Sequence, residues 1–381
     1  MRPRFTWVRT KLDELLPVAR PLLPEPSKVA RYLQISHEAR HYSNNGPVLR
    51  MYKSELSRLI EVDEDRLVLL SSATQCIQGL VTLLNFESWR VPDYTFAASG
   101  TAVMSCGKKV ELIDVDEASM AVPKGLFSDK IANHQQGTIV VMPFGSQFEA
   151  SEWVGASNVI FDAAASLGNL GKSFADLDNS SAVVFSLHAT KVLGAGEGGL
   201  AVCGSASLAR DLEMWSQFGF DSSRTSVRLG TNAKISDFNC AVGLASLDGR
   251  RAELSRWKKL RKVTNELTLR HFELNVSQQV RGATPYWILK CESSAQADAL
   301  EAFMEARQIQ TRRWWPKPLS SMPLFSTEAE FGNNPVAKKL AGSSLGLPFF
   351  REITPENLIR VSETLDQFVQ LWNPVTSKIE Y

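Results

Sequence analysis

The stretch Ser181–Gly199, SAVVFSLHATKVLGAGEGG, decides the fold of this chain. Its first half is an apolar run, which is typical of a strand covered on both faces of a parallel sheet. Its second half turns polar at Ser186, His188 and Lys191 and then becomes rich in glycine. Open α/β sheets bind ligands at the carboxyl ends of their strands, so these polar side chains are expected at a binding site. A lysine held there suits Schiff-base chemistry, although most lysines are solvated surface residues.

The glycines of this stretch also match the dinucleotide fingerprint G-x-G-x-x-G, from Gly194 to Gly199. That fingerprint must follow a strand and open a helix. Here the next segment, Leu200–Cys203, is predicted to be a strand, so we discard a dinucleotide site.

Composition excludes several classes of protein. The chain has 381 residues, 44% hydrophobic and 22% charged, which is an ordinary globular composition with room for two or three domain-sized units. Its 42 basic and 41 acidic residues nearly cancel, which argues against nucleic acid or an anionic membrane as a partner.

Cysteine usage and hydropathy indicate the cellular compartment. The five cysteines are scattered, without metal-ligand spacing, and fit reduced thiols. The first residues, MRPRFTWVRTKLDELLP, carry charge where a signal peptide is apolar, and no run approaches about 18 apolar residues. We therefore expect a soluble cytoplasmic protein without a metal site or a membrane span.

Seven β-rich segments alternate with helical patterns such as Thr74–Phe86, which favours an α/β fold with a mostly parallel seven-stranded sheet. They are Arg66–Leu70, Trp89–Val91, Lys109–Val115, Gly137–Met142, Asn158–Phe161, Ala182–Leu187 and Gly199–Cys203.

The pattern changes after Ala206. The spacing predicts a helix over Leu208–Phe218 and one long helix from Phe238 to Leu269. A smaller α+β unit follows, with a strand at Pro285–Cys291 and helices at Ala295–Ala306 and Pro355–Trp372. We expect a large domain over residues 1–250, which includes an N-terminal arm, and a small domain over 251–381.

Three further stretches are expected beside Lys191 at the carboxyl edge of the sheet. The stretch SSATQC, Ser71–Cys76, lies between a predicted strand and a predicted helix. The free N–H groups at the start of that helix could bind a phosphate, or the stretch could serve only as the helix N-cap. VPDYTF, Val91–Phe96, ends in an aromatic ring that could stack on a flat heterocycle or belong to the core. VIFDAAAS, Val159–Ser166, contains Asp162 at the end of an apolar strand, where a carboxylate needs a cationic partner.

A protonated pyridinium nitrogen would be such a partner for Asp162. These features describe a site for pyridoxal 5′-phosphate (PLP): a phosphate-binding turn, an aromatic ring that can stack, an aspartate at a strand end and a lysine. Asp162 and Lys191 lie 29 residues apart, about one step between neighbouring strands.

At this point the chain resembles the DegT/StrS-type sugar aminotransferases, PLP enzymes of the aspartate-aminotransferase fold (fold type I). The resemblance covers nearly the whole chain. It rests on NNGPVLRMYKSEL, SSATQC, VPDYTFAASGTAVMSCGKKVELIDVD, FDAAASLG, FSLHATKVLGAGEGG, LGTNAKISDFNCAVGL, IQTRRWWPKPL and LGLP.

The resemblance implies roles for individual residues. Lys191 would form the Schiff base with the cofactor, Asp162 would pair with the ring nitrogen, and Phe96 would stack on the ring. Phosphate would be bound by the backbone of Ala73, Thr74 and Gln75 and by the hydroxyls of Thr74 and Ser186. Asn232 would come from the partner subunit of a homodimer. Apart from the resemblance, the cluster Arg312–Trp315, with Arg312 and Trp314 as candidate substrate contacts, could receive the diphosphate of a nucleotide-linked substrate or could equally be a seam between packed domains. His188 is a further candidate substrate contact or a packing residue at the strand end.

Two positions depart from the family pattern. Ala165 stands where many members have a glutamine that bonds the cofactor's phenolic oxygen. Ala73 replaces the usual glycine of the phosphate loop, which requires a negative φ at this residue.

The reaction implied is transfer of an amino group from L-glutamate to a keto sugar, most simply a nucleotide-linked 4-keto-6-deoxyhexose. Two alternatives remain: a PLP-binding regulatory or sensory protein without turnover, and a PLP-dependent sugar dehydratase. The family's dehydratases have histidine at the position of Lys191, which argues against the second.

Overall fold

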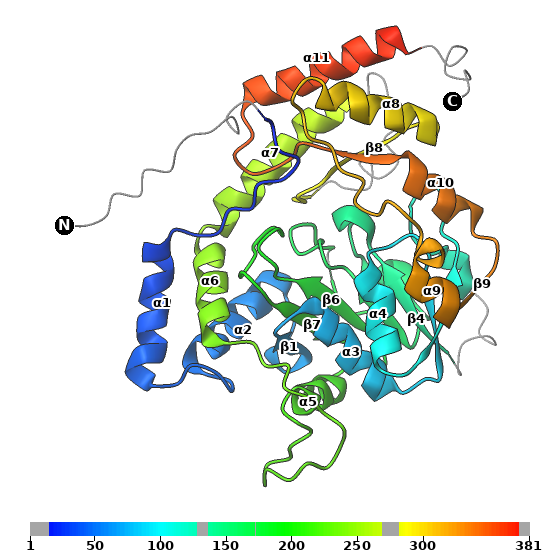
Figure 1. Cartoon of the computed structure of the whole chain (residues 1–381). Helices are drawn as coiled ribbons and strands as arrows, with labels where there is room; N and C mark the ends of the chain where they lie inside the picture. Colours follow the sequence, from blue (N-terminus) through cyan, green and yellow to red (C-terminus); the bar gives the residue numbers. More distant parts are fainter. Residues whose placement is uncertain (1–14, 128–135, 172, 269–281, 373–381) are drawn as a thin grey trace.

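The computed structural model describes residues 15–127, 136–171, 173–268 and 282–372 (Figure 1). Its main feature is a sheet of eight strands in the order β1-β7-β6-β5-β4-β2-β3-β9. The strands are β1 (Leu67–Leu70), β2 (Ser88–Pro92), β3 (Lys109–Ile113), β4 (Gln136–Val141), β5 (Val159–Asp162), β6 (Ala182–Ser186), β7 (Gly199–Cys203) and β9 (Ala329–Phe331). The α/β class and all seven strands expected from the sequence are confirmed.

Strand β7 is the one member of this sheet that runs against its neighbours. It pairs antiparallel with both β1 and β6, and the other five strand pairs are parallel. The chain passes from β6 to β7 through a loop without a helix, and a short connection of this kind returns the chain in the opposite direction. Gly199 therefore opens a strand and not a helix, in agreement with the rejection of a dinucleotide fingerprint.

Alternate side chains of β6 enter two different cores, as the two-residue period of a strand requires. Val183 and Phe185 belong to the core shared with α2 (Pro47–Ile60) and α6 (Asp237–Asp248). Ala182 and Val184 belong to the core shared with α3 (Ala73–Leu84) and α5 (Ala206–Trp215). The sheet is thus covered on both faces, and its polar groups reach solvent mainly at the strand ends.

The remaining helices complete these layers or lie above the large sheet. They are α1 (Pro26–Ala39), α4 (Ala97–Ser105), α7 (Arg250–Thr268), α8 (Ser294–Glu305), α9 (Pro323–Glu328), α10 (Pro335–Ser343) and α11 (Pro355–Leu371). Short 3-10 turns lie at Glu64–Arg66, Lys124–Phe127, Pro143–Gly145, Ala150–Trp153 and Leu319–Ser321. In Figure 1, α7, α8 and α11 lie above the large sheet together with an antiparallel pair, β8 (Trp287–Lys290) and β10 (Ser344–Leu347).

Two expectations are corrected by the structure. The helix predicted from Phe238 to Leu269 is two helices, α6 and α7, which separate at Gly249. The sheet has an eighth strand, because β9 pairs in parallel with β3 although it follows α7, β8 and α8 in sequence. Phe325 likewise packs in the core of the large sheet. A domain division near residue 250 stays a prediction.

None of the helices within the described ranges is long and apolar enough to cross a membrane.

Candidate active site

Lys191 is held beyond the end of β6 by a tight backbone arrangement. Its N–H donates to the carbonyl of His188 at 2.9 Å, and Ala195 N–H donates to the carbonyl of Leu187 at 2.6 Å. Gly196 has φ +87°, a conformation that few residues other than glycine adopt readily. The glycines of this stretch therefore fold the loop back on itself and present the lysine. Its Nζ donates a hydrogen bond to Tyr286 Oη at 2.7 Å.

Asp162 is the last residue of β5 and is only 8% exposed. Its carboxylate accepts hydrogen bonds from Ser99 Oγ at 2.7 Å and from the N–H of Ala164 at 3.2 Å. Burial raises the pKa of this carboxyl, while Ser99, the Ala164 N–H and the charge of Lys191 act in the opposite direction. The lysine is thus near enough for its charge to act on Asp162, yet among the described residues the carboxylate forms no ion pair.

The amino end of α3 lies against the start of β7. Ser72 caps the helix by accepting a hydrogen bond from Gln75 N–H at 3.1 Å. A Cβ at Gly199 would lie 2.4 Å from the carbonyl carbon of Ser72 and 2.5 Å from the nitrogen of Ala73, so glycine is required there. Gly199 is also the register partner of Ser186. The Ser186 hydroxyl therefore lies near the helix end, where backbone N–H groups attract anions.

Ala73, which replaces the usual glycine of the phosphate loop, has the negative φ that alanine requires. It is the first residue of α3 and does not occur among the residues with positive φ. Replacement of glycine by alanine is therefore free of backbone strain at this position.

Phe96 stands at the entry of α4 with 63% of its surface exposed. Ser99, three residues further along the same helix, contacts Asp162. A ring this large and this exposed, three residues before the serine that contacts the buried carboxylate, is available to stack on a flat group.

The predicted substrate residues separate into different environments. His188 Nδ1 contacts Thr190 Oγ1 at 2.8 Å, and its Nε2 lies 3.6 Å from Glu197 Oε1, so it belongs to a local polar network. Arg312 is exposed and lies over the ring of Trp314, with its Cζ 4.9 Å from the centroid. Asn232 Oδ1 accepts from Lys234 Nζ at 2.6 Å.

The neighbours of these residues support a packing role for part of the cluster. Arg313 pairs with Glu301 at 3.1 Å and with Asp298. Trp315 stacks on Phe144 with 4.3 Å between the centroids.

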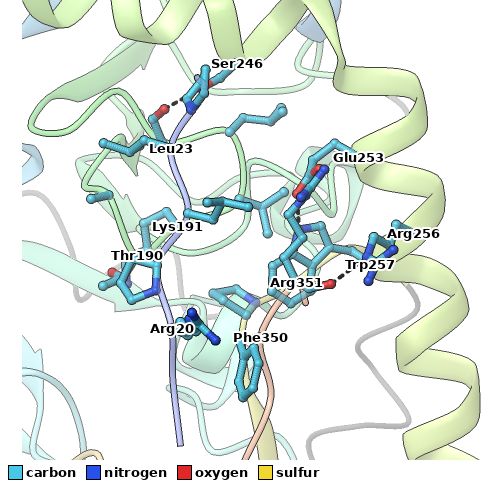
Figure 2. Close-up of a pocket in the computed structure, with 18 of the residues that line it drawn as sticks. Arg20, Leu23, Thr190, Lys191, Ser246, Glu253, Arg256, Trp257, Phe350 and Arg351 are labelled. Atoms are coloured by element: carbon cyan, nitrogen blue, oxygen red, sulfur yellow. Dashed lines mark hydrogen bonds and ion pairs between the residues drawn. The ribbon is translucent and has the colours of Figure 1, made fainter. Parts of the chain in front are cut away.

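A cavity of about 750 Å³ opens beside Lys191. Figure 2 shows Lys191 on one side of it and Arg256 and Trp257 of α7 on the other, with the segment that carries Arg20 and Leu23 passing between them. Trp314 and Tyr286 also line this cavity, whereas Arg312 does not.

The cavity wall carries a positive excess. Its basic residues are Arg20, Lys28, Lys191, Arg256, Lys259 and Arg351, against the acidic Glu25 and Glu253. Arg351 Nε pairs with Glu253 at 2.5 Å, so the charge of Glu253 is compensated by Arg351 and does not offset the other basic side chains. Such a wall favours an anionic ligand.

Sequence reasoning missed Ser99 and Tyr286. Ser99 lies one turn after Phe96 in a segment where no helix was predicted. Tyr286 comes from a strand start 95 residues away from Lys191, and nothing in its local sequence marks it.

The buried carboxylate is the observation that tests whether these residues fit PLP. A pyridinium ring beneath Phe96 would give Asp162 the cation that its buried position demands, and the end of α3 would accept the phosphate. Lys191 lies within electrostatic reach of the same carboxylate. The residues present therefore fit the cofactor.

Comparisons with known proteins agree with this fit. The dTDP-4-amino-4,6-dideoxy-D-glucose transaminase of Shigella dysenteriae is 23% identical over 363 residues, which cover 91% of this chain and 97% of the relative. DesI, solved in the presence of its TDP-sugar product, superposes with a TM-score of 0.81 at 24% identity over 96% of each chain. The sugar aminotransferase CalS13 from Micromonospora echinospora gives a TM-score of 0.78 at 17% identity and covers 93% of this chain and all of its own. The model of the DegT/DnrJ/EryC1/StrS aminotransferase family matches residues 27–366. The chain belongs to this family and is an aminotransferase whose cofactor is pyridoxal phosphate.

Proposed function

We propose that this enzyme transfers an amino group from L-glutamate to a keto sugar linked to a nucleoside diphosphate, most simply a 4-keto-6-deoxyhexose. The observation that carries the proposal is Lys191, whose charge acts on the buried carboxylate of Asp162 and which lines a cavity with a positive wall. The Shigella relative acts on a dTDP-linked sugar and DesI was solved with a TDP-sugar product, which supports the class of substrate.

Each residue of the site has a part in this reaction. PLP, when bound, supplies the electron sink. Asp162 would keep the ring nitrogen protonated, and its hydrogen bonds from Ser99 and the Ala164 N–H favour the ionised carboxylate against the larger effect of burial. Phe96 would orient the ring, and the end of α3 with Ser186 would bind the phosphate. Lys191 would hold the cofactor, and its Nζ is the group that would move a proton as general base and acid.

The cavity supports a specific place for the nucleotide diphosphate. Arg20, Lys28 and Lys259 are exposed residues on its wall. Arg20 lies 4.0 Å from Glu352, and among the described residues Lys28 and Lys259 form no ion pair. A diphosphate carries two negative charges, which several basic side chains around one opening would attract. This proposal moves the diphosphate from the predicted Arg312 to the side of Arg20, while Trp314 remains within reach of the sugar.

A homodimer is part of the proposal. The segment that joins α5 to α6 extends away from the body of the molecule below α5 (Figure 1). It exposes 54% of Val227 and 76% of Leu229, and Phe238 at the start of α6 is 53% exposed. Apolar side chains on a projecting segment are typical of an interface, and Asn232 lies on this same segment.

We also propose a cytoplasmic location. All five cysteines, each within the described ranges, are free, which agrees with a reducing compartment.

The decisive experiment mixes purified holoenzyme with glutamate and a panel of nucleotide-linked keto sugars and measures 2-oxoglutarate. We expect 2-oxoglutarate in proportion to aminated sugar for at least one member. The Lys191→Ala variant, which keeps the cavity but lacks the amine, is the control and should neither turn over nor form a borohydride-trapped adduct. A variant that still formed the adduct would refute the assignment of Lys191.

One alternative has a specific observation in its favour. Ala165 is buried at 8% exposure and has no polar group to offer the cofactor's phenolic oxygen. A PLP-binding regulatory protein would tolerate this loss. Such a protein would bind PLP at Lys191 and yield no 2-oxoglutarate with any sugar of the panel.

A further inference from the structure

Tyr286 is the side chain in direct contact with the amine of Lys191. Its Oη accepts a hydrogen bond from Nζ at 2.7 Å, and Nζ also lies 5.2 Å from the centroid of the tyrosine ring. Within the described ranges, Lys191 forms no ion pair with a carboxylate. We propose that Tyr286 is a catalytic residue that receives the amine of Lys191 whenever the amine is not bound to the cofactor. This inference rests on the proposed role of Lys191.

The ring of Tyr286 is held in place from several sides. It meets Trp314 edge-on with centroids 4.9 Å apart and Phe144 with centroids 5.7 Å apart. Its backbone carbonyl accepts a hydrogen bond from the guanidinium of Arg261, a buried side chain on α7. Burial lowers the pKa of Arg261 to about 9. A tyrosine fixed by two aromatic edges and a main-chain contact presents its hydroxyl at a constant position, which a hydrogen-bond partner of the amine requires.

The contact with Nζ favours the charged amine, because a phenol oxygen that accepts a hydrogen bond from an ammonium stabilises it. When the amino donor displaces Lys191, the freed Nζ leaves the cofactor and needs such a partner in a partly buried site. Tyr286 Oη can accept from the ammonium and donate to the neutral amine, so the contact survives each change of protonation. The proton itself stays on the lysine or on the substrate.

The test replaces Tyr286 with phenylalanine, which removes the hydroxyl and keeps the ring with its packing against Trp314 and Phe144. We expect the borohydride-trapped adduct with PLP to persist. The single-turnover rate with glutamate should fall about tenfold, the size of effect expected for one lost hydrogen bond to a charged group.

A second measurement reports on the amine without any turnover. The rate at which the apoprotein forms the trapped adduct depends on the fraction of neutral Lys191 amine. Loss of the hydroxyl removes stabilisation of the ammonium, so the pH profile of Tyr286→Phe should shift to lower pH. A merely structural role for the tyrosine would leave this profile unmoved.

Tyr94→Phe is the matched control, because Tyr94 belongs to the same group of aromatic rings and does not touch Lys191. It should keep the wild-type rate and pH profile. Wild-type behaviour of Tyr286→Phe in both measurements would overturn the inference about Tyr286. Failure of the proposed function has a different signature, since it would appear as an adduct that survives in Lys191→Ala.

Discussion

Asp162 is placed to pair with a bound cofactor, and its burial lowers the stability of the apoprotein. Its carboxyl is buried and its pKa is raised by that burial, so the folded apoprotein binds a proton there more readily than the unfolded chain does. The free energy of unfolding of the apoprotein therefore falls as the pH rises from the ordinary carboxyl range through the folded pKa, and then levels off. A bound pyridinium removes this penalty.

Asp162→Asn tests whether the buried, ionisable carboxyl destabilises the apoprotein and serves the cofactor. Asparagine keeps an acceptor for Ser99 and cannot ionise, so the apo variant should unfold a few degrees above the apo wild type near neutral pH. This difference should shrink as the pH falls through the raised pKa of the folded carboxyl toward the ordinary carboxyl range, because the wild-type side chain then becomes protonated. Turnover should fall about 10²-fold or more, because the ring nitrogen loses its anion. Scanning calorimetry at several pH values and a glutamate assay check both parts, and a pH-independent difference in melting would contradict the argument.

The residues that could be predicted from the sequence share one property. Lys191 and Asp162 stand where an apolar run turns polar, and that transition marks the carboxyl end of a buried strand. Tyr286 and Ser99 have no such mark, because their relation to the site depends on packing between segments distant in sequence. The alternation of buried strands with helices therefore predicts the sheet and the residues at its carboxyl edge. It does not predict which side chains from other segments contact those residues.

The same limit applies to whole elements. Long buried strands and amphipathic helices were predictable from periodicity, with ends within a few residues. Strand β9 has three residues and exposes two of them, so its apolar pattern is too short to recognise. The break between α6 and α7 depends on one glycine, Gly249, in an otherwise continuous helical pattern.

Gly199 links two elements, and its replacement should disturb the end of α3. The Cβ of Gly199→Ala would meet the Ser72 carbonyl and the Ala73 nitrogen at distances that no side chain tolerates, so the helix end must move. We expect a loss of about 1–3 kcal/mol in the free energy of unfolding. The dissociation constant of PLP should rise further than that of a cofactor analogue without phosphate.

Gly249→Ala is the matched control for this experiment. A Cβ at Gly249 meets nothing within 4 Å, and its φ of −95° suits alanine. It should change stability by less than about 0.5 kcal/mol and leave the PLP dissociation constant unchanged. Equal affinity of Gly199→Ala for PLP and for the analogue would argue against a phosphate site at α3.

At the scale of the whole molecule, the projecting segment between α5 and α6 decides whether one chain suffices for a complete site. Leu229 is 76% exposed there, and the nearby Arg228 is anchored to Asp211 by an ion pair of 2.8 Å. An anchored segment that presents apolar side chains to solvent gains stability when a second copy covers it.

Leu229→Asp places a charge in that contact and should weaken dimerisation about 10²-fold. Light scattering should show monomers at micromolar concentration, and PLP should be lost faster on dialysis because Asn232 of the partner subunit no longer closes the phosphate site. The control is Leu371→Asp, an equally exposed leucine (71%) at the end of α11, on the opposite side of the molecule in Figure 1. A dimer that persists in Leu229→Asp, or a monomer that retains PLP as firmly as the wild type, would rule out a site shared through this segment.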